Sequence, residues 1–306
     1  MKNNRGKYSD TDLYALARVI CHKNKLGEIR RHLLVNIGFE DYNLQVLTTK
    51  GQYYIKFLSD NHTQEEIIKY GRLIRIIDKS KIKTTKFYGL KHLGQDQYII
   101  SNALSDARSI YVKRKAPNTE ELASLVTELN KLHKIKYKLP CSYSPWSINS
   151  FRGTSTAIAK YLSKSDLKIL EKVNKIYDNL DFSDLPKCFI HSDLTKTNVF
   201  TENGKIYLLD FFCSGYDYRI LDIAVVLANL MYDECSYVSL TDRISKFLNM
   251  YDDLCSIEKQ QLKNFALVAA AMEWYGALYE KYYRNKATNE TKYWINLSKT
   301  TLQNEL

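Results

Sequence analysis

The pattern of hydrophobic residues changes from that of strands to that of helices near residues 102–106, and this change constrains the fold more than any other feature. Before it, apolar and polar residues alternate in short runs bounded by turns, as in strands. The runs that we expect to form strands cover residues 29–37, 42–49, 52–58, 86–90 and 97–101. One helix is predicted among them, over residues 63–78. The first hundred residues therefore predict an antiparallel sheet with one inserted helix.

From residue 118 onward the apolar spacing is that of amphipathic helices. Asn118 and Glu121 have the spacing of a helix cap and its third residue, and leucines follow at intervals of three and four. Short strands are expected only around residues 188–191, 198–200 and 205–209. A chain of 306 residues is long enough for two domains. We expect an α+β fold in two lobes, with residues 1–103 forming the smaller lobe and residues 104–306 the larger, mostly helical one.

Composition limits the classes of partner. No apolar stretch approaches the roughly 20 residues of a membrane-spanning helix, so no membrane partner is expected. The six cysteines form no C-x-x-C pair, so we expect no structural metal. The polar start, Met1 to Asp10, lacks the apolar segment of a secretory signal, and a cytoplasmic location is expected. The net charge of +11 suits nucleic acid, anionic lipid or phosphorylated small molecules. Because aromatic and basic residues do not interleave, no nucleic-acid partner is expected.

Three polar residues, Asp193, Asn198 and Asp210, follow or precede apolar strand-like runs. The spacing is H-x-D-x-x-x-x-N, and the second Asp comes after eleven further residues. Phosphoryl transfer needs one carboxylate that accepts a hydroxyl proton, together with an amide oxygen and a carboxylate that hold Mg²⁺. As isolated residues, Asp and Asn are also common turn formers. The three residues together at this spacing favour a catalytic loop.

The segment from His191 to Asn198 resembles the H-G-D-x-x-x-x-N loop of the aminoglycoside phosphotransferase and choline kinase superfamily, small-molecule relatives of protein kinases. The run that ends in Asp210 resembles the metal-binding strand of those enzymes, and the stretch around Asp222 resembles the segment that follows it. The resemblance implies a two-lobed, protein-kinase-like fold. It also implies a kinase that uses ATP and Mg²⁺, with Asp193 as catalytic base and Asn198 and Asp210 as Mg²⁺ ligands. GTP in place of ATP stays open.

The same resemblance assigns residues of the smaller lobe. Lys56 matches the strand lysine that contacts the α- and β-phosphates. Glu66 is the expected partner of that lysine, with Glu65 as the fallback. Glu66 also fits a second interpretation, because Thr63-x-x-Glu66 is a capping box. The resemblance also implies two nucleotide contacts. Gly38 would lie in a turn over the phosphates, and Ser101 and Ala103 would belong to a hinge whose backbone meets adenine.

Two residues of the larger lobe need comment. Ser192 replaces the usual glycine of the catalytic loop. Asp222 opens an apolar helix and is expected to be a helix cap or a brace of the loop. His191 and His133 are expected to be buried, hydrogen-bonded histidines without a role in proton transfer.

The acceptor is expected to be a small molecule with a hydroxyl group. Aromatic residues in the last helices favour an amino alcohol such as choline, ethanolamine or a homoserine-like compound, because aromatic rings attract ammonium groups. The residues expected at the acceptor are Glu273, Trp274, Tyr275 and Trp294. The alternative for the three aromatic residues is core packing between helices.

Other functions remain as alternatives. An aminoglycoside phosphotransferase would use acidic residues of the C-terminal region, namely Asp233, Glu234, Asp242, Asp252 and Asp253. A non-catalytic pseudokinase is the further alternative, although Lys56, Asp193, Asn198 and Asp210 are all present. A protein kinase is not supported, because no A-P-E motif follows Asp210. We expect a monomer or a homodimer.

Overall fold

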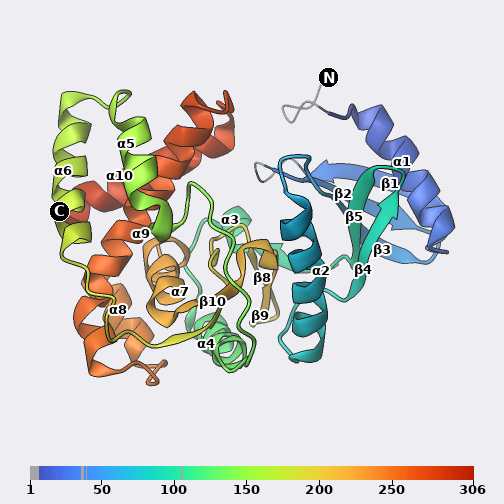
Figure 1. The fold of residues 1–306 in the computed structure, drawn as a ribbon. Coiled ribbons are helices and arrows are strands. Elements are labelled where there is room, and N and C mark those ends of the chain that lie inside the picture. The colour runs from blue at the N-terminus through green and yellow to red at the C-terminus, as the bar shows by residue number, and fades with distance from the viewer. Residues whose placement is uncertain (1–6, 36–37, 39, 105) are drawn as a thin grey trace. The chain divides into compact units, whose positions relative to one another are not determined.

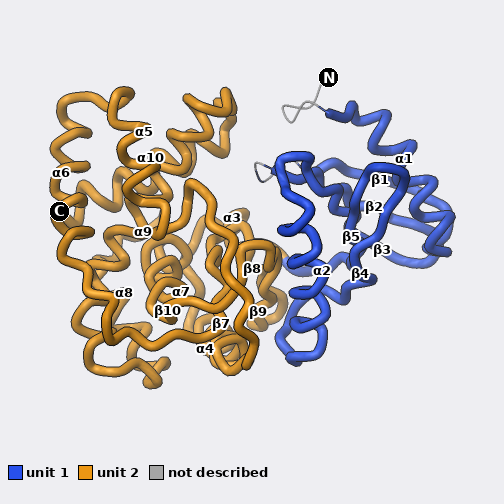
Figure 2. The backbone as a smooth tube through the Cα atoms, in the orientation of Figure 1, with its two compact units in different colours: residues 1–107 blue, residues 108–306 orange. Residues whose placement is uncertain are grey.

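The computed structural model describes residues 7–35, 38, 40–104 and 106–306. It divides into two compact units, residues 1–107 (unit 1) and residues 108–306 (unit 2), which are coloured separately in Figure 2. The last two residues of the first predicted strand, Asn36 and Ile37, lie outside the described residues.

Unit 1 is an antiparallel sheet with two helices (Figure 1). The sheet order is β1-β2-β3-β5-β4, and every neighbouring pair is antiparallel. The elements are α1 (Asp10–Lys23), β1 (Ile29–Val35), β2 (Tyr42–Thr48), β3 (Gly51–Phe57), α2 (Gln64–Lys79), β4 (Phe87–Leu93) and β5 (Asp96–Asn102). The predicted sheet with a helix inserted between its third and fourth strands is confirmed.

Alternation of apolar residues builds the core of unit 1. In β2, Leu44 and Val46 are buried, and in β3 Ile55 and Phe57 are buried, while their neighbours along each strand are more exposed. These side chains meet the apolar face of α1 in one cluster. The turn between β2 and β3 fixes the register, so that Asn43 lies opposite Lys56.

Unit 2 is mostly helical, with five short strands. Its sheets have the orders β10-β7 and β6-β8-β9. The elements are β6 (Arg108–Ser109), α3 (Ile110–Lys113), α4 (Thr119–His133), η1 (Ile148–Ser150), α5 (Phe151–Ala159), α6 (Lys164–Asp178), β7 (Lys187–Ile190), β8 (Val199–Glu202), β9 (Lys205–Leu208), η2 (Phe211–Cys213), β10 (Gly215–Tyr218), α7 (Arg219–Val225), η3 (Val226–Leu230), α8 (Leu240–Leu248), α9 (Ser256–Tyr282) and α10 (Asn289–Glu305). The capping box predicted for Asn118 and Glu121 begins α4.

The long helix α9 forms the centre of unit 2 and packs against α10, α7, α5 and α6. All residues of its middle third, 265–273, are buried, and four of them are alanine. These small side chains let neighbouring elements approach closely. At Gly276 the ring of Trp146 takes the place of a side chain, since a Cβ there would lie 2.4 Å from the Trp146 ring. Within the described residues, no helix is long and apolar enough to cross a membrane.

The contact at Gly276 gives a stability prediction. Alanine normally stabilises a helix interior by about 1 kcal/mol relative to glycine, but overpacking costs about 1–3 kcal/mol. We therefore expect Gly276→Ala to lower the free energy of unfolding of unit 2. Gly153→Ala in α5 is the matched control, because a Cβ at Gly153 meets no atom within 4 Å, and this change should be neutral or stabilising. The three tryptophans all lie in unit 2, so urea denaturation followed by tryptophan fluorescence measures this unit. Equal effects of the two substitutions would contradict the packing argument.

Candidate active site

The loop after β7 holds Asp193 and Asn198 against each other. The Asn198 amide Nδ2 donates to Oδ2 of Asp193 at 2.7 Å and to the Asp193 carbonyl oxygen at 3.1 Å. Asp210 follows β9, and the N–H of its neighbour Leu209 donates to the carbonyl oxygen of Asn198 at 2.9 Å. The structure therefore brings Asp193 and Asn198 into contact and ties the chain next to Asp210 to the same loop.

A buried carboxylate fixes the start of this loop. Oδ2 of Asp222 accepts the backbone N–H of His191 at 2.8 Å, and Oδ1 accepts that of Ser192 at 2.7 Å. Asp222 is fully buried within α7, and its Oδ2 also lies 3.2 Å from Nε2 of His133. Asp222 was expected to be either a brace of the loop or a helix cap. The structure shows it as the brace of the loop.

Two residues of the site have left-handed backbone conformations. Ser192 has a φ of +68° and Asp210 a φ of +62°. A left-handed conformation costs a residue other than glycine about 1–2 kcal/mol, which explains why glycine is usual at the position of Ser192. The hydrogen bond from the Ser192 N–H to Asp222 offsets this cost.

His191 is a structural residue. Its side chain is fully buried, Nε2 lies 3.0 Å from the carbonyl oxygen of Leu209, and Nδ1 accepts the N–H of Asp193 at 3.3 Å. Burial lowers the pKa of His191, so the imidazole is neutral and Nε2 is the donor to Leu209. The ring thus joins the catalytic loop to the end of β9, as predicted.

The oxygens of Asn198 and Asp210 fit a Mg²⁺ site chemically. Because Nδ2 of Asn198 donates to Asp193, the amide oxygen Oδ1 is the atom of this side chain that could bind a metal ion. Mg²⁺ prefers amide and carboxylate oxygens. Among the described residues, no group of three or more His, Cys, Asp or Glu side chains could hold a metal ion. The assignment of Asn198 and Asp210 as Mg²⁺ ligands stays a prediction.

In unit 1, Lys56 on β3 has a partner that the sequence did not predict. Its Nζ lies 3.2 Å from Oδ2 of Asp41, and Oδ1 of Asp41 lies 2.8 Å from Nε2 of His62. Burial by itself raises the pKa of Asp41, but the charge of Lys56 and the hydrogen bond with His62 outweigh burial and lower this pKa to about 2. Asp41 is therefore a buried anion that orients Lys56.

The expected pair of Lys56 and Glu66 is wrong for this structure. Oε2 of Glu66 accepts the N–H and the hydroxyl of Thr63, at 2.8 and 3.0 Å. The first N–H groups of a helix lack partners within the helix, and Glu66 satisfies one of them in a capping box. The residue of α2 that faces Lys56 is Tyr70, whose ring centroid lies 5.5 Å from Nζ.

The register of β2 and β3 explains the position of Asp41. Because Asn43 lies opposite Lys56, Asp41 lies two residues along on the same face, diagonal to Lys56. The turn predicted at Lys50 and Gly51 would place Gln45 opposite Lys56 instead, so this partner did not follow from the predicted turn.

The other residues of unit 1 that are expected to contact the nucleotide are Gly38, Ser101 and Ala103. Gly38 has a φ of +92°, a conformation open to glycine, and its neighbours at 37 and 39 lie outside the described residues. Ser101 lies in β5, between β3 and β4. The backbone N–H of Ala103, expected at adenine, donates to the carbonyl oxygen of Gln52 at 3.0 Å. That N–H is therefore part of the sheet.

Of the four residues expected at the acceptor, Glu273 has the surroundings of a binding residue. It is only 5 % exposed, and its Oε2 accepts Nδ2 of Asn229 at 2.6 Å and the Ser298 hydroxyl at 3.4 Å. Its Oε1 has no hydrogen-bond partner within the described residues. Burial and the nearby charge of Asp193 raise the pKa of Glu273 to about 8. Glu273 thus lies near the catalytic loop.

The three aromatic residues follow the alternative interpretation. Trp274, Tyr275 and Trp294 are 1 %, 0 % and 4 % exposed. Trp274 packs against Tyr275, and Trp294 packs against Tyr111 and Tyr293. These rings are core of the helical unit, because the two faces of α9 are both covered.

A small pocket adjoins the catalytic loop. It is partly open to solvent, and Ser192, Trp146, Leu221 and Val225 are among its lining residues. Trp146, which lies in the segment between α4 and α5, was not predicted as a site residue.

Comparison with known proteins places these observations in a family context. Residues 33–238 match the model of the phosphotransferase enzyme family. A homoserine kinase from Methylobacillus flagellatus is 22 % identical over 270 residues, which cover 84 % of this chain and 82 % of that protein.

Two solved structures share the fold. A choline/ethanolamine kinase family protein from Mesorhizobium loti superposes with a TM-score of 0.69 at 10 % identity, covering 95 % of this chain and 94 % of that one. A spectinomycin phosphotransferase in complex with ADP and spectinomycin gives a TM-score of 0.65 at 14 % identity, covering 93 % and 98 %. The predicted kinase-like α+β fold is confirmed.

The contacts of Asp41 give a pH prediction. Burial disfavours the charged form of His62, but the hydrogen bond and the charge of Asp41 outweigh burial and raise the pKa of His62. Because this pKa is higher in the folded state, the stabilisation is fully present below the unfolded pKa and is lost as pH rises through the folded pKa. We expect Asp41→Asn to lower the His62 pKa, measured by NMR titration of the ring protons, and to flatten this pH dependence. Glu66→Gln is the control and should leave the His62 pKa unchanged; a shift of equal size would contradict the assignment.

Proposed function

The chain belongs to the phosphotransferase enzyme family, and on this premise we propose that it is an ATP- and Mg²⁺-dependent kinase. In the proposed reaction the γ-phosphate goes to a hydroxyl of a small amino-alcohol-type acceptor, such as choline, ethanolamine or a homoserine-like compound. The observation that carries the proposal is the loop in which Asn198 holds the carboxylate of Asp193 while Asp222 fixes the loop backbone. The ADP bound to the spectinomycin phosphotransferase supports an adenine nucleotide.

Asp193 is the proposed catalytic base. Its carboxylate accepts the proton of the acceptor hydroxyl as the hydroxyl oxygen bonds to the γ-phosphorus, and the bond from that phosphorus to the β,γ-bridging oxygen breaks, so that ADP leaves. Asn198 orients Asp193 through Nδ2. Oδ1 of Asn198 and the carboxylate of Asp210 would hold Mg²⁺. When bound, the metal ion neutralises charge on the phosphate oxygens.

In unit 1, Lys56 is the proposed contact of the nucleotide phosphates. Asp41 keeps its ammonium group charged and oriented, the role that the sequence assigned to Glu66. Gly38 and the segment from Ser101 to Ala103 remain the proposed contacts of phosphate and adenine, with the N–H of Ala103 excepted because it is bonded to Gln52.

The buried carboxyl of Glu273 supports an acceptor with an ammonium group. By contrast, three of the five acidic residues of the aminoglycoside alternative, Asp233, Glu234 and Asp242, have structural partners. Asp233 accepts N–H groups of Ala116 and Cys235, and Asp242 accepts the hydroxyl of Ser239, the residue that caps α8. Glu234 contacts Tyr293 and Lys196. We therefore favour the amino-alcohol class.

The test of the proposed function is a panel of choline, ethanolamine, homoserine and an aminoglycoside with ATP and Mg²⁺, with ADP release measured. We expect turnover with an acceptor of the amino-alcohol class. Asp193→Asn should preserve ATP binding and lower kcat by about 10²–10⁴-fold, because proton acceptance is lost. Asp210→Ala should weaken Mg²⁺-dependent nucleotide binding instead. Equal activity of wild type and Asp193→Asn would refute the base, and ATP binding without turnover of any acceptor would favour a pseudokinase.

A further inference from the structure

Within the described residues, only one of the two carboxyl oxygens of Glu273 has hydrogen-bond partners. Asn229 from η3 and Ser298 from α10 both donate to Oε2. The charged groups close enough to affect it are Asp193 and Lys196, both from the catalytic loop. Oε1 is buried and has no partner within the described residues.

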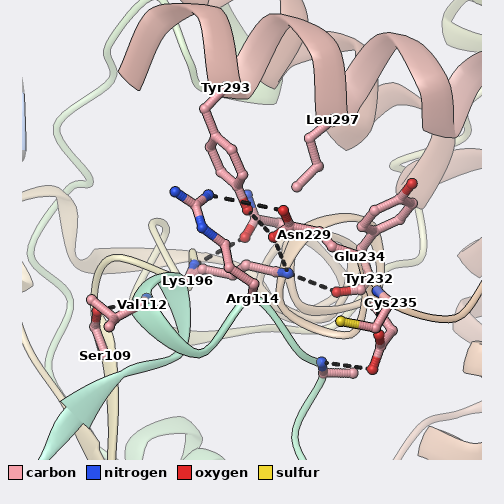
Figure 3. Close-up of polar contacts among 12 residues, drawn as sticks. Ser109, Val112, Arg114, Lys196, Asn229, Tyr232, Glu234, Cys235, Tyr293 and Leu297 are labelled. Atoms are coloured by element: carbon pink, nitrogen blue, oxygen red, sulfur yellow. Dashed lines mark hydrogen bonds and ion pairs between the residues drawn. The ribbon is translucent and has the colours of Figure 1, made fainter. Parts of the chain in front are cut away.

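Lys196 does not provide the missing hydrogen bond. Its Nζ donates to the carbonyl oxygen of Tyr232 at 2.7 Å and lies 3.4 Å from Oε1 of Glu234 (Figure 3). Its side chain is fully buried, and Tyr293 donates to the same Glu234 oxygen. Figure 3 shows this cluster around Lys196, with Asn229 beside it. The cation of the loop is thus held by Tyr232 and Glu234.

The orientation of Asn229 is fixed by its two partners. Its Oδ1 accepts the backbone N–H of Lys196 at 2.9 Å, so its NH₂ group is the end that donates to Glu273. Asn229 therefore joins the catalytic loop to Glu273, and it has no donor directed to Oε1. When Glu273 is ionised, Oε1 lacks an N–H or O–H donor, and a charged donor would be the most stabilising.

The pocket beside the catalytic loop lies next to the segments that carry Glu273 and Asn229. Val225 lines the pocket and lies four residues before Asn229 along the α7–η3 segment. Trp146, which also lines the pocket, covers Gly276, three residues after Glu273 on α9. Neither Glu273 nor Asn229 is among the lining residues.

We propose that Oε1 of Glu273 accepts an N–H of a primary ammonium group on the acceptor, and that the enzyme thereby selects primary over quaternary ammonium compounds. This inference rests on the proposed function and deepens it. In the empty enzyme burial favours the protonated form of Glu273, because an unpaired buried carboxylate is costly. The proton of this form is on Oε1, since Oε2 accepts two hydrogen bonds. Binding of the ammonium group makes the carboxylate favourable, and the O–H proton leaves to solvent.

A quaternary ammonium group lacks the N–H that Oε1 requires. Such groups are held by the faces of aromatic rings. Trp274, Tyr275 and Trp294 are buried in helix packing and do not form such a cage. Choline therefore loses both kinds of contact, whereas ethanolamine and homoserine keep the hydrogen bond.

The experiment compares matched acceptors that differ only in N-methylation: ethanolamine with choline, and homoserine with its N-trimethyl analogue. We expect kcat/KM to be about 10- to 100-fold higher for the preferred primary amine, the range of one charge-assisted hydrogen bond. Glu273→Gln should remove most of this preference by placing an amide donor where Oε1 was. Glu171→Gln, an exposed residue of α6, is the matched control and should retain the preference.

A second measurement needs no variant. Calorimetric titration of the wild-type protein with the preferred amine, in two buffers of different ionisation enthalpy at pH 7, should show release of protons on binding. A choline preference, an unchanged preference in Glu273→Gln, or binding without proton release would overturn this inference and leave the kinase function intact. Failure to phosphorylate any of the four acceptors would overturn the proposed function, and this inference with it.

Discussion

The carboxylate of Asp222 is the interaction on which the rest of the site depends. Its two oxygens bind the consecutive N–H groups of His191 and Ser192, and this pair of bonds holds Ser192 in a left-handed conformation. The loop then turns so that Asp193 meets Asn198. Because Asp222 is fully buried within α7, the position of the catalytic loop is set by the helical core and not by the loop sequence alone.

A second set of buried polar groups ties the same loop to the proposed acceptor residue. Asn229 binds the backbone of Lys196 with one end of its amide and Glu273 with the other. Burying a polar atom without a hydrogen-bond partner is costly, and Oε1 of Glu273 is one of the buried side-chain atoms that have no such partner within the described residues. In this account the acceptor supplies the missing partner, and loop position and acceptor recognition share one network.

Local sequence predicted the elements well, because strand alternation and helix caps are short-range signals. The sheet of unit 1 and the cap of α4 at Asn118 formed as predicted. The ion pair of Lys56 was predicted wrongly, because two roles competed for Glu66 and the nearer, local one prevailed. The burial of Trp274 could not be derived, because it depends on which helices cover both faces of α9. Long-range packing decided these points.

The most direct test of the account is kcat of Asp222→Asn, measured with saturating ATP and the preferred acceptor. The substitution turns one oxygen acceptor into an NH₂ donor that faces a loop N–H, so Asp193 should be displaced while the side-chain volume is kept. The account predicts a loss of about 10²-fold in kcat, the order expected for a misplaced catalytic group. Asp242→Asn, which alters only the contact with Ser239 at the start of α8, should keep full activity. An Asp222→Asn enzyme as active as wild type would contradict the central role of this carboxylate.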